Sequence, residues 1–177
     1  MCSSELNLKE RLDQLVDFTR PLGLRPKTAE PVAVVMKAVG KIKQQCERQG
    51  IKIESDIADG LPSVSLDADR LQEAVLNLLI NACEAMPDGG FIHVDVRSDK
   101  KKESIQIEIR DSGLGVSPDH IKHVGQPFFT TKPGGVGLGA AIAKRIVGAQ
   151  GGTIRFESKP GKGFKSILSL PVSAKRV

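Results

Sequence analysis

Apolar residues recur along the chain with two different periods, and together these predict a small domain of helices and strands. Spacings of three and four predict helices over residues 5–22, 32–49, 67–86 and 138–150. Alternation of apolar and polar residues predicts strands over 51–55, 91–97, 104–110, 153–158 and 164–170. Half-polar strands joined by short turns favour a sheet with helices on one face. The predicted fold class is α+β, a two-layer α/β sandwich whose mixed sheet is mainly antiparallel.

The first predicted helix differs from the others because its apolar stripe is narrow. Its apolar positions are Leu8, Leu12, Leu15, Phe18 and Leu22. Such a stripe is typical of a coiled coil or a two-helix hairpin, in which a partner helix completes the core. Prolines and glycines then predict a linker over residues 23–31. The chain is thus divided into a helical stub over 1–22, this linker, and a globular domain over 32–177.

Composition narrows the classes of function. The chain has 177 residues, with 40% hydrophobic and 27% charged positions, which indicates a globular protein. Three widely spaced cysteines exclude a disulfide framework, and no apolar run approaches the roughly 20 residues of a membrane span. The net charge of +5 allows an anionic partner, but only 3% of residues are aromatic, which disfavours single-stranded nucleic acid. We expect a cytoplasmic location and no nucleic-acid partner.

The predicted helix over residues 67–86 carries a polar stripe opposite its apolar face. Glu73, Asn77, Asn81 and Glu84 follow one another at steps of four, four and three. Asparagine is a poor residue for a helix interior, so two asparagines in register indicate a functional role. Their side-chain oxygens suit a hard cation such as Mg²⁺ that bridges to phosphates. Taken alone, an ordinary solvent-facing stripe explains the pattern equally well.

A second candidate feature follows the strand over residues 104–110. Asp111 ends the strand, and Gly113 and Gly115 come two and four residues later. Glycines in such a turn allow the backbone to approach a ligand, and a carboxylate fixed there can accept a hydrogen bond from an exocyclic amine. Turns of this kind are common, so the feature is weak by itself.

A third feature is a glycine run at the start of the last predicted helix, formed by Gly135, Gly137 and Gly139. Backbone N–H groups at a helix N-terminus favour anions, although a flexible linker is the alternative explanation. Hydroxyls and a cation that suit phosphate stand just upstream, at Thr130, Thr131 and Lys132. There is no GxxxxGK[ST] loop, and the long segment before the glycines excludes the dinucleotide fingerprint.

The order of these pieces resembles that of the N, G1, F and G2 boxes of the GHKL superfamily. The chain is similar, over roughly residues 30–171, to the catalytic and ATP-binding domain of two-component sensor histidine kinases, a domain shared with gyrase B and MutL. The wording Asn-Ala-Cys-Glu-Ala-Met and Pro-Phe-Phe-Thr-Thr-Lys is most similar to the nitrogen-regulator and dicarboxylate-sensor type. The resemblance implies the GHKL ATPase fold, with ATP and Mg²⁺ as cofactors.

The resemblance also assigns roles to positions of this sequence. It implies that Asn81 ligates Mg²⁺, that Asn77 supports the metal and phosphates, and that Asp111 accepts from the adenine amino group. Gly113 and Gly115 would shape the adenine pocket, and residues 116–134 would form a mobile lid. The remaining ATP-binding positions would be Thr130, Thr131, Lys132, Gly135, Gly137, Leu138 and Gly139.

The implied reaction is transfer of the γ-phosphoryl group to a histidine on a dimerisation hairpin of a full-length homodimeric kinase, which then feeds a response regulator receiver domain. Related ATPases carry a glutamate base where this chain has Asn77, so a gyrase-type hydrolase is disfavoured. Glu73, one turn earlier, is a candidate to polarise the incoming imidazole. A nucleotide-gated interaction module without transfer is the other alternative.

Several positions depart from the family pattern, among them Gly139-Ala-Ala in place of the more common Gly-Leu-Ala/Ser. Glu84 stands where many sensor kinases carry a basic residue near the phosphates, so Lys132 is expected to supply that contact, and Phe164 replaces a usual threonine. No histidine has the context of a phosphoacceptor; the three present are His93, His120 and His123. We therefore expect the chain to be a fragment of a longer kinase, and that full-length kinase could be anchored in a membrane. Residues 1–22 would then be the end of the second hairpin helix.

Overall fold

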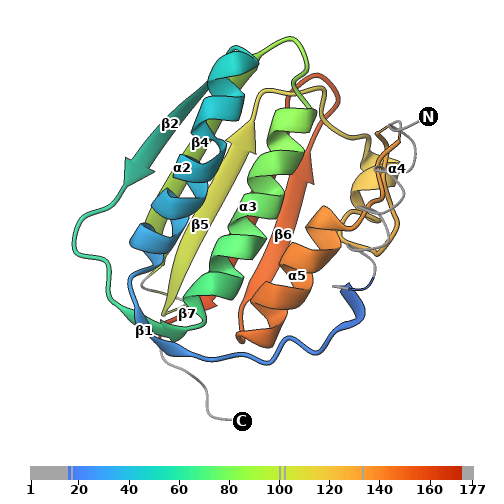
Figure 1. Cartoon of the computed structure of the whole chain (residues 1–177). Helices are drawn as coiled ribbons and strands as arrows, with labels where there is room; N and C mark the ends of the chain where they lie inside the picture. Colours follow the sequence, from blue (N-terminus) through green and yellow to red (C-terminus); the bar gives the residue numbers. More distant parts are fainter. Residues whose placement is uncertain (1–15, 17, 100, 102, 133, 173–177) are drawn as a thin grey trace.

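A computed structural model describes residues 16, 18–99, 101, 103–132 and 134–172, which form a sheet with helices on one face (Figure 1). The five-stranded sheet has the order β2-β4-β5-β7-β6. Its strands are β2 (Ile51–Ile57), β4 (Gly90–Asp99), β5 (Ser104–Asp111), β6 (Thr153–Ser158) and β7 (Phe164–Pro171). Only the β2–β4 pair is parallel among these neighbours. The predicted two-layer α+β class, with a mixed and mainly antiparallel sheet, is confirmed.

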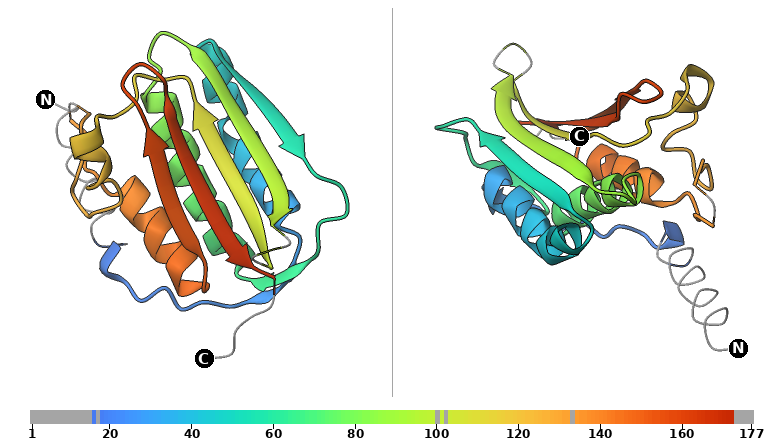
Figure 2. Two further views of the ribbon diagram at one scale, coloured as in Figure 1. Left: turned by 180° about the vertical axis from the view of Figure 1, so that it is seen from behind. Right: turned by 90° about the horizontal axis from the view of Figure 1, so that it is seen from above.

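Three helices form the second layer, and Figure 2 shows all of them on the same side of the sheet. They are α2 (Pro31–Arg48), α3 (Ala68–Glu84) and α5 (Gly139–Ala149), with α3 in the middle (Figure 1). Asp67 caps α3 because its side chain accepts a hydrogen bond from the N–H of Arg70 at 3.1 Å. The N-terminal end of α3 is therefore set by one carboxylate.

The core lies between the sheet and these helices. Leu71, Val75 and Leu79 of α3 are fully buried, and they belong to one cluster with inward-facing residues such as Val94 and Ile107. Burying one such side chain contributes about 1.5–3 kcal/mol, so the helices are held mainly by this contact. The opposite strand positions carry charges instead.

The uncovered face of the sheet is polar, as strand alternation predicts. Glu108 of β5 accepts from Lys165 of β7 at 3.2 Å and lies 3.6 Å from Arg97 of β4. Ion pairs that keep some access to solvent, like these, contribute little, about 0–1 kcal/mol each. They keep this face soluble without defining the fold.

The segment expected as a linker, residues 23–31, contributes to the domain. Its strand β1 (Lys27–Ala29) pairs antiparallel with β3 (Val64–Leu66). The N–H of Arg25 donates to Oδ2 of Asp67 at 2.8 Å. Neither strand is predicted from the sequence because three residues are too few to show a period. The short α4 (Pro118–Ile121), in the segment expected to be irregular, escapes prediction for the same reason.

Most of the helix predicted over residues 5–22 lies outside the described residues. Val16, Phe18 and Thr19 are helical, and the chain leaves the helix at Arg20, directly before Pro21. Proline disfavours the helical conformation of the residue before it, which explains the earlier end. None of the helices in the described part of the chain is long and apolar enough to span a bilayer.

Two buried thiols mark the contact between α2 and α3. The sulfur atoms of Cys46 and Cys83 are 3.0 Å apart, and both residues are free cysteines. Burial, together with the neighbouring Cys46, raises the pKa of Cys83 to about 12. Because the thiolate is the reactive form, this pair acts as core packing.

Replacement of a core leucine of α3 tests the packing. Leu79 is fully buried, so Leu79→Ala should lower the free energy of unfolding by about 2–5 kcal/mol through lost contacts and a residual cavity. Urea unfolding followed by circular dichroism measures the change. The matched control is Leu114→Ala, because Leu114 is 77% exposed. Equal stability of the two variants would contradict the assignment of α3 as the central core helix.

Candidate functional site

A pocket of about 810 Å³ opens where α3, the end of β5 and the start of α5 meet the loop between β5 and α5. Most of the site residues expected from the sequence line it. They are Asn77, Asn81, Asp111, Gly115, Thr130, Thr131, Lys132, Gly135, Gly137, Leu138 and Gly139. Two expected residues do not: Glu73 lines a neighbouring cavity, and Gly113 supports Asp111 from behind. Segments distant in sequence thus converge on one place.

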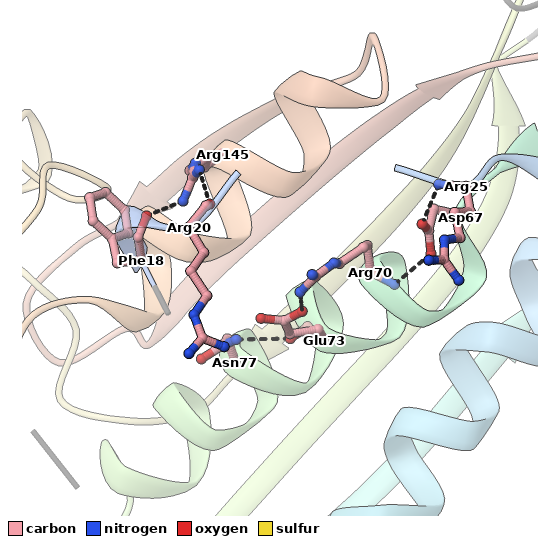
Figure 3. A network of polar contacts seen from close by, with 8 residues as sticks. All are labelled: Phe18, Arg20, Arg25, Asp67, Arg70, Glu73, Asn77 and Arg145. Atoms are coloured by element: carbon pink, nitrogen blue, oxygen red, sulfur yellow. Dashed lines mark hydrogen bonds and ion pairs between the residues drawn. The ribbon is translucent and has the colours of Figure 1, made fainter. Parts of the chain in front are cut away.

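The asparagines of α3 form one wall. The Nδ2 group of Asn77 donates to the backbone oxygen of Glu73 at 2.9 Å, which leaves Oδ1 as the atom that can meet a ligand (Figure 3). The carboxamide of Asn81 lies against Gly139 of α5. A Cβ added to Gly139 would lie 3.1 Å from Nδ2 and 3.2 Å from Oδ1 of Asn81. The absence of a side chain at residue 139 therefore gives the Asn81 carboxamide its room.

Asp111 occupies the inner end of the pocket and is only 5% exposed. Its Oδ1 accepts from the N–H of Gly113 at 2.8 Å and from the N–H of Phe164 at 3.2 Å. Its Oδ2 accepts no hydrogen bond from the described residues, so it is the acceptor left for a ligand amine. Burial raises the pKa of this carboxyl, while the two N–H groups and the charge of Lys132 act in the opposite direction.

The turn after Asp111 is shaped by Gly115. This residue has φ of +69°, and an added Cβ would lie 2.2 Å from the backbone oxygen of Lys159. Only glycine fits there. The next N–H, of Val116, donates to Oγ of Ser158 at 2.8 Å, and that hydroxyl donates to the oxygen of Gly163 at 2.7 Å. The loop therefore leaves the pocket from a fixed starting point.

Lys132 connects the loop to α3. Its Nζ donates to the backbone oxygen of Asn81 at 2.8 Å and to Oε2 of Glu84 at 2.8 Å. The lysine expected to replace the missing basic residue at position 84 thus lies directly beside the glutamate found there. Glu84 partly neutralises it, and both side chains keep access to solvent.

The loop also contains both histidines expected in the lid. The rings of His120 and His123 lie 5.9 Å and 5.4 Å from the ring of Phe129, measured between centroids. Phe128 next to it has φ of +67° and is 57% exposed. The histidines therefore pack on an aromatic residue of the loop, which gives them a structural role.

Sequence reasoning missed the apolar wall of the pocket. Phe156 of β6 and Phe164 of β7 line it, with ring centroids 5.7 Å apart. Ile109 of β5 adds to the same wall. Strand alternation alone does not distinguish a residue that faces the core from one that faces a cavity, and only the assembled sheet shows that this apolar layer is open here. A flat apolar surface beside a buried carboxylate suits an aromatic base.

The donor atoms fit a Mg²⁺ ion that is shared with phosphates. In the described part of the chain, no group of three or more His, Cys, Asp or Glu residues could hold a metal. The carboxamide oxygens of Asn77 and Asn81 offer one or two hard ligands. Mg²⁺ characteristically takes few protein ligands and completes its shell with water and phosphate oxygens.

Comparison with known proteins decides the family. The family described as "Histidine kinase-, DNA gyrase B-, and HSP90-like ATPase" matches residues 66–174. This chain belongs to that ATPase family. The match confirms the resemblance to the catalytic domain of histidine kinases, while the narrower nitrogen-regulator and dicarboxylate-sensor likeness stays a prediction.

Similar proteins bear the name of sensor histidine kinases. Sensor histidine kinase ZraS of Escherichia coli (strain K12) is 31% identical over 169 residues, which are 96% of this chain and 36% of ZraS. The chain thus spans about a third of that relative. Full-length ShkA, solved with AMPPNP, has a TM-score of 0.81 at 22% identity and covers 96% of this chain and 37% of its own.

A second solved structure is the histidine kinase ThkA in complex with the response regulator protein TrrA. It has a TM-score of 0.83 at 20% identity and covers 98% of this chain and 50% of its own. At these identities the two structures show that the fold is shared. The ATPase family and its fold are therefore established for this chain.

Asp111 provides a test of the inner end of the pocket. Asp111→Asn should weaken ATP binding about 10-fold or more, because an amide that still accepts from Gly113 turns its NH₂ toward the base. The raised pKa means that the ionised Asp111 opposes folding at neutral pH. The protonated Asp111 carboxyl contributes fully to stability below its ordinary pKa, and this contribution is lost as the pH rises through its raised pKa in the folded protein. The variant should therefore melt no lower than the unaltered chain at pH 7.

Isothermal titration calorimetry and thermal unfolding measure these two quantities. Asp56→Asn, on an exposed strand position, is the matched control and should change neither. Unchanged ATP affinity in Asp111→Asn would remove this carboxylate from the site.

The Lys132–Glu84 pair yields a second test. Glu84→Gln should strengthen ATP binding several-fold, because it removes a negative charge beside the expected phosphate site and releases Lys132. Stability should change by no more than about 1 kcal/mol, since the pair is partly exposed. Glu157→Gln, at another exposed glutamate near a lysine, is the control for lost charge alone. Weaker binding in Glu84→Gln would show that Lys132 needs Glu84 to be positioned.

Proposed function

We propose that this domain binds Mg-ATP in the pocket and transfers the γ-phosphoryl group to a histidine on a dimerisation hairpin of a longer sensor kinase. The observation that carries the proposal is the polarity of the pocket. A buried carboxylate oxygen of Asp111 lies at one end, and the Asn77–Asn81 wall, Thr130, Thr131 and Lys132 lie at the other. A base with an exocyclic amino group matches the carboxylate end, and a chain of phosphates matches the end with the amides, hydroxyls and lysine.

In this arrangement the adenine amino group donates to Oδ2 of Asp111, and the base lies against Phe156 and Phe164. The phosphates run past the glycines at the start of α5 toward the asparagines of α3. Backbone N–H groups at that helix start favour their negative charge. When bound, Mg²⁺ would neutralise charge on the phosphates, with Asn81 and Asn77 as its protein ligands.

The chemical step needs positioning more than covalent assistance. A lone pair on an imidazole nitrogen forms a bond to Pγ, the bond from Pγ to the bridging oxygen breaks, and ADP leaves with that electron pair. The ring proton passes to a base. Glu73 is the proposed base, since it lines a cavity next to the Asn77 turn, where its carboxylate is bonded to Arg70 at 2.8 Å.

Hydrolysis of the gyrase type is the weaker candidate. Position 77 holds a carboxamide, which cannot take a proton from water. Support for the transferase comes from the similar ZraS, called a sensor histidine kinase, and from ShkA with AMPPNP and ThkA with a response regulator. The parent protein is proposed to be a homodimer with this domain in the cytoplasm.

The test uses γ-labelled ATP and a separately made hairpin that contains an acceptor histidine. Label on the hairpin supports the proposal. ATP binding without transfer supports the interaction module, and free phosphate alone supports a hydrolase.

Asn81→Ala should reduce transfer on the order of 100-fold with the fold intact, because it removes a ligand at the phosphates. Gln72→Ala on the same helix, outside the pocket, is the matched control and should leave transfer unchanged. Full transfer by Asn81→Ala would exclude Asn81 as a metal ligand.

A further inference from the structure

A second cavity, of about 390 Å³, adjoins the nucleotide pocket on the side of the N-terminal segment. Ile142 lines both cavities, so they meet at the wall between α3 and α5. The polar side chains around the second cavity are Arg20, Arg70, Glu73 and Arg145. Arg70 is paired with Glu73 at 2.8 Å. The described lining thus holds three arginines and one glutamate. A cationic cavity that borders the phosphate end of a nucleotide pocket suggests a function in phosphate binding.

Arg145 of α5 fixes the N-terminal segment at this cavity (Figure 3). Its Nη1 donates to the backbone oxygen of Phe18, and its Nη2 donates to the backbone oxygen of Arg20 at 2.6 Å. The guanidinium carbon also lies 5.4 Å from the centroid of the Phe18 ring, within the range of a cation–π contact. One side chain thus holds two backbone carbonyls of the segment, on either side of Thr19.

The segment is held further along as well. Leu22 packs against the hydrophobic core, and the N–H of Arg25 donates to Asp67, the residue that caps α3. The stretch from Phe18 to Arg25 therefore lies across α5 and α3 with contacts at both ends and in the middle. Its backbone is positioned by the domain itself.

The position of the Arg20 side chain follows from this. Its carbonyl faces Arg145, and Figure 3 shows its side chain running the other way, from α5 across to the turn of α3 that carries Glu73 and Asn77. Arg20 and Glu73 line the same cavity. Asn77 is the outermost member of the stripe that lines the nucleotide pocket, one turn from Asn81. The Arg20 guanidinium is thereby brought toward the turn of α3 that leads to Asn77, next to the nucleotide pocket and outside its lining.

We propose that Arg20 binds the terminal phosphate of the nucleotide, and that Arg145 is a positioning residue that presents it. This rests on the proposed function, because a base at Asp111 directs the phosphates past Asn81 to Asn77, where the γ-phosphate lies nearest Arg20. A guanidinium offers paired donors that match phosphate oxygens. It supplies positive charge at the terminal phosphate, in a site where position 84 carries a glutamate. Arg20 would then distinguish ATP from ADP.

The experiment compares two nucleotides by isothermal titration calorimetry with Mg²⁺: AMPPNP, a non-hydrolysable triphosphate, and ADP. Arg20→Ala should weaken AMPPNP binding about 10-fold and leave ADP binding within about twofold, since only the triphosphate reaches Arg20. Arg145→Ala should give the same selective loss. The double variant should be no weaker than Arg20→Ala, because both changes remove the same contact.

Arg155→Ala is the matched control, because Arg155 is an exposed arginine on β6 that lines neither cavity. It should bind both nucleotides like the unaltered chain. Thermal unfolding checks the fold of each variant, and Arg20→Ala, at an exposed side chain, keeps the test valid if Arg145→Ala unfolds.

The outcomes distinguish a failure of the Arg20 assignment from a failure of the proposed function. An Arg20→Ala variant with unchanged AMPPNP affinity, or with equal losses for AMPPNP and ADP, overturns the assignment of Arg20 to the terminal phosphate. If the unaltered chain binds neither nucleotide, the proposed function itself fails and this inference fails with it. A selective loss of AMPPNP affinity in Arg20→Ala supports both.

Discussion

The whole site depends on the burial of one helix, α3. Its apolar face, with Leu71, Val75 and Leu79, is fixed in the middle of the helical layer. The helical period then places Asn77 and Asn81 on the opposite side, where α5 and the loop can close over them. The polar stripe is costly in isolation, because asparagine weakens a helix, but core packing on the other face more than offsets this. One face of α3 thus stabilises the fold, and its other face carries the polar residues of the site.

The second constraint is electrostatic and lies at the end of β5. Asp111 is buried as a carboxylate, which is unfavourable unless donors compensate it. Gly113 and Phe164 supply two N–H groups to one oxygen and leave the other for a ligand. Because Phe164 begins β7, the ligand-facing carboxylate is oriented by a strand more than fifty residues away in the chain. The carboxylate and the sheet pairing β5–β7 therefore depend on each other.

Much of this could be read from the sequence, because long elements carry a clear period and the pocket residues lie in short local motifs. What could not be read depended on tertiary contact. The three-residue strands β1 and β3 have no period of their own and form only as a pair. Strand alternation does not show that Phe156 faces a cavity, because that depends on the assembled sheet. Arg145 gave no local signal at all, as its partners Phe18 and Arg20 are over 120 residues away in sequence.

The helix α5 joins two parts of the molecule in a way that its sequence does not suggest. Its first residue, Gly139, leaves room for the carboxamide of Asn81, while Arg145 holds the N-terminal segment six residues further on. At 1.5 Å per residue these two points are only about 9 Å apart on one rigid rod. A tilt or a shift of α5 would therefore change its contacts both with Asn81 and with the N-terminal segment. The domain therefore contains a short mechanical linkage between the place where phosphates would bind and the place where the preceding polypeptide arrives.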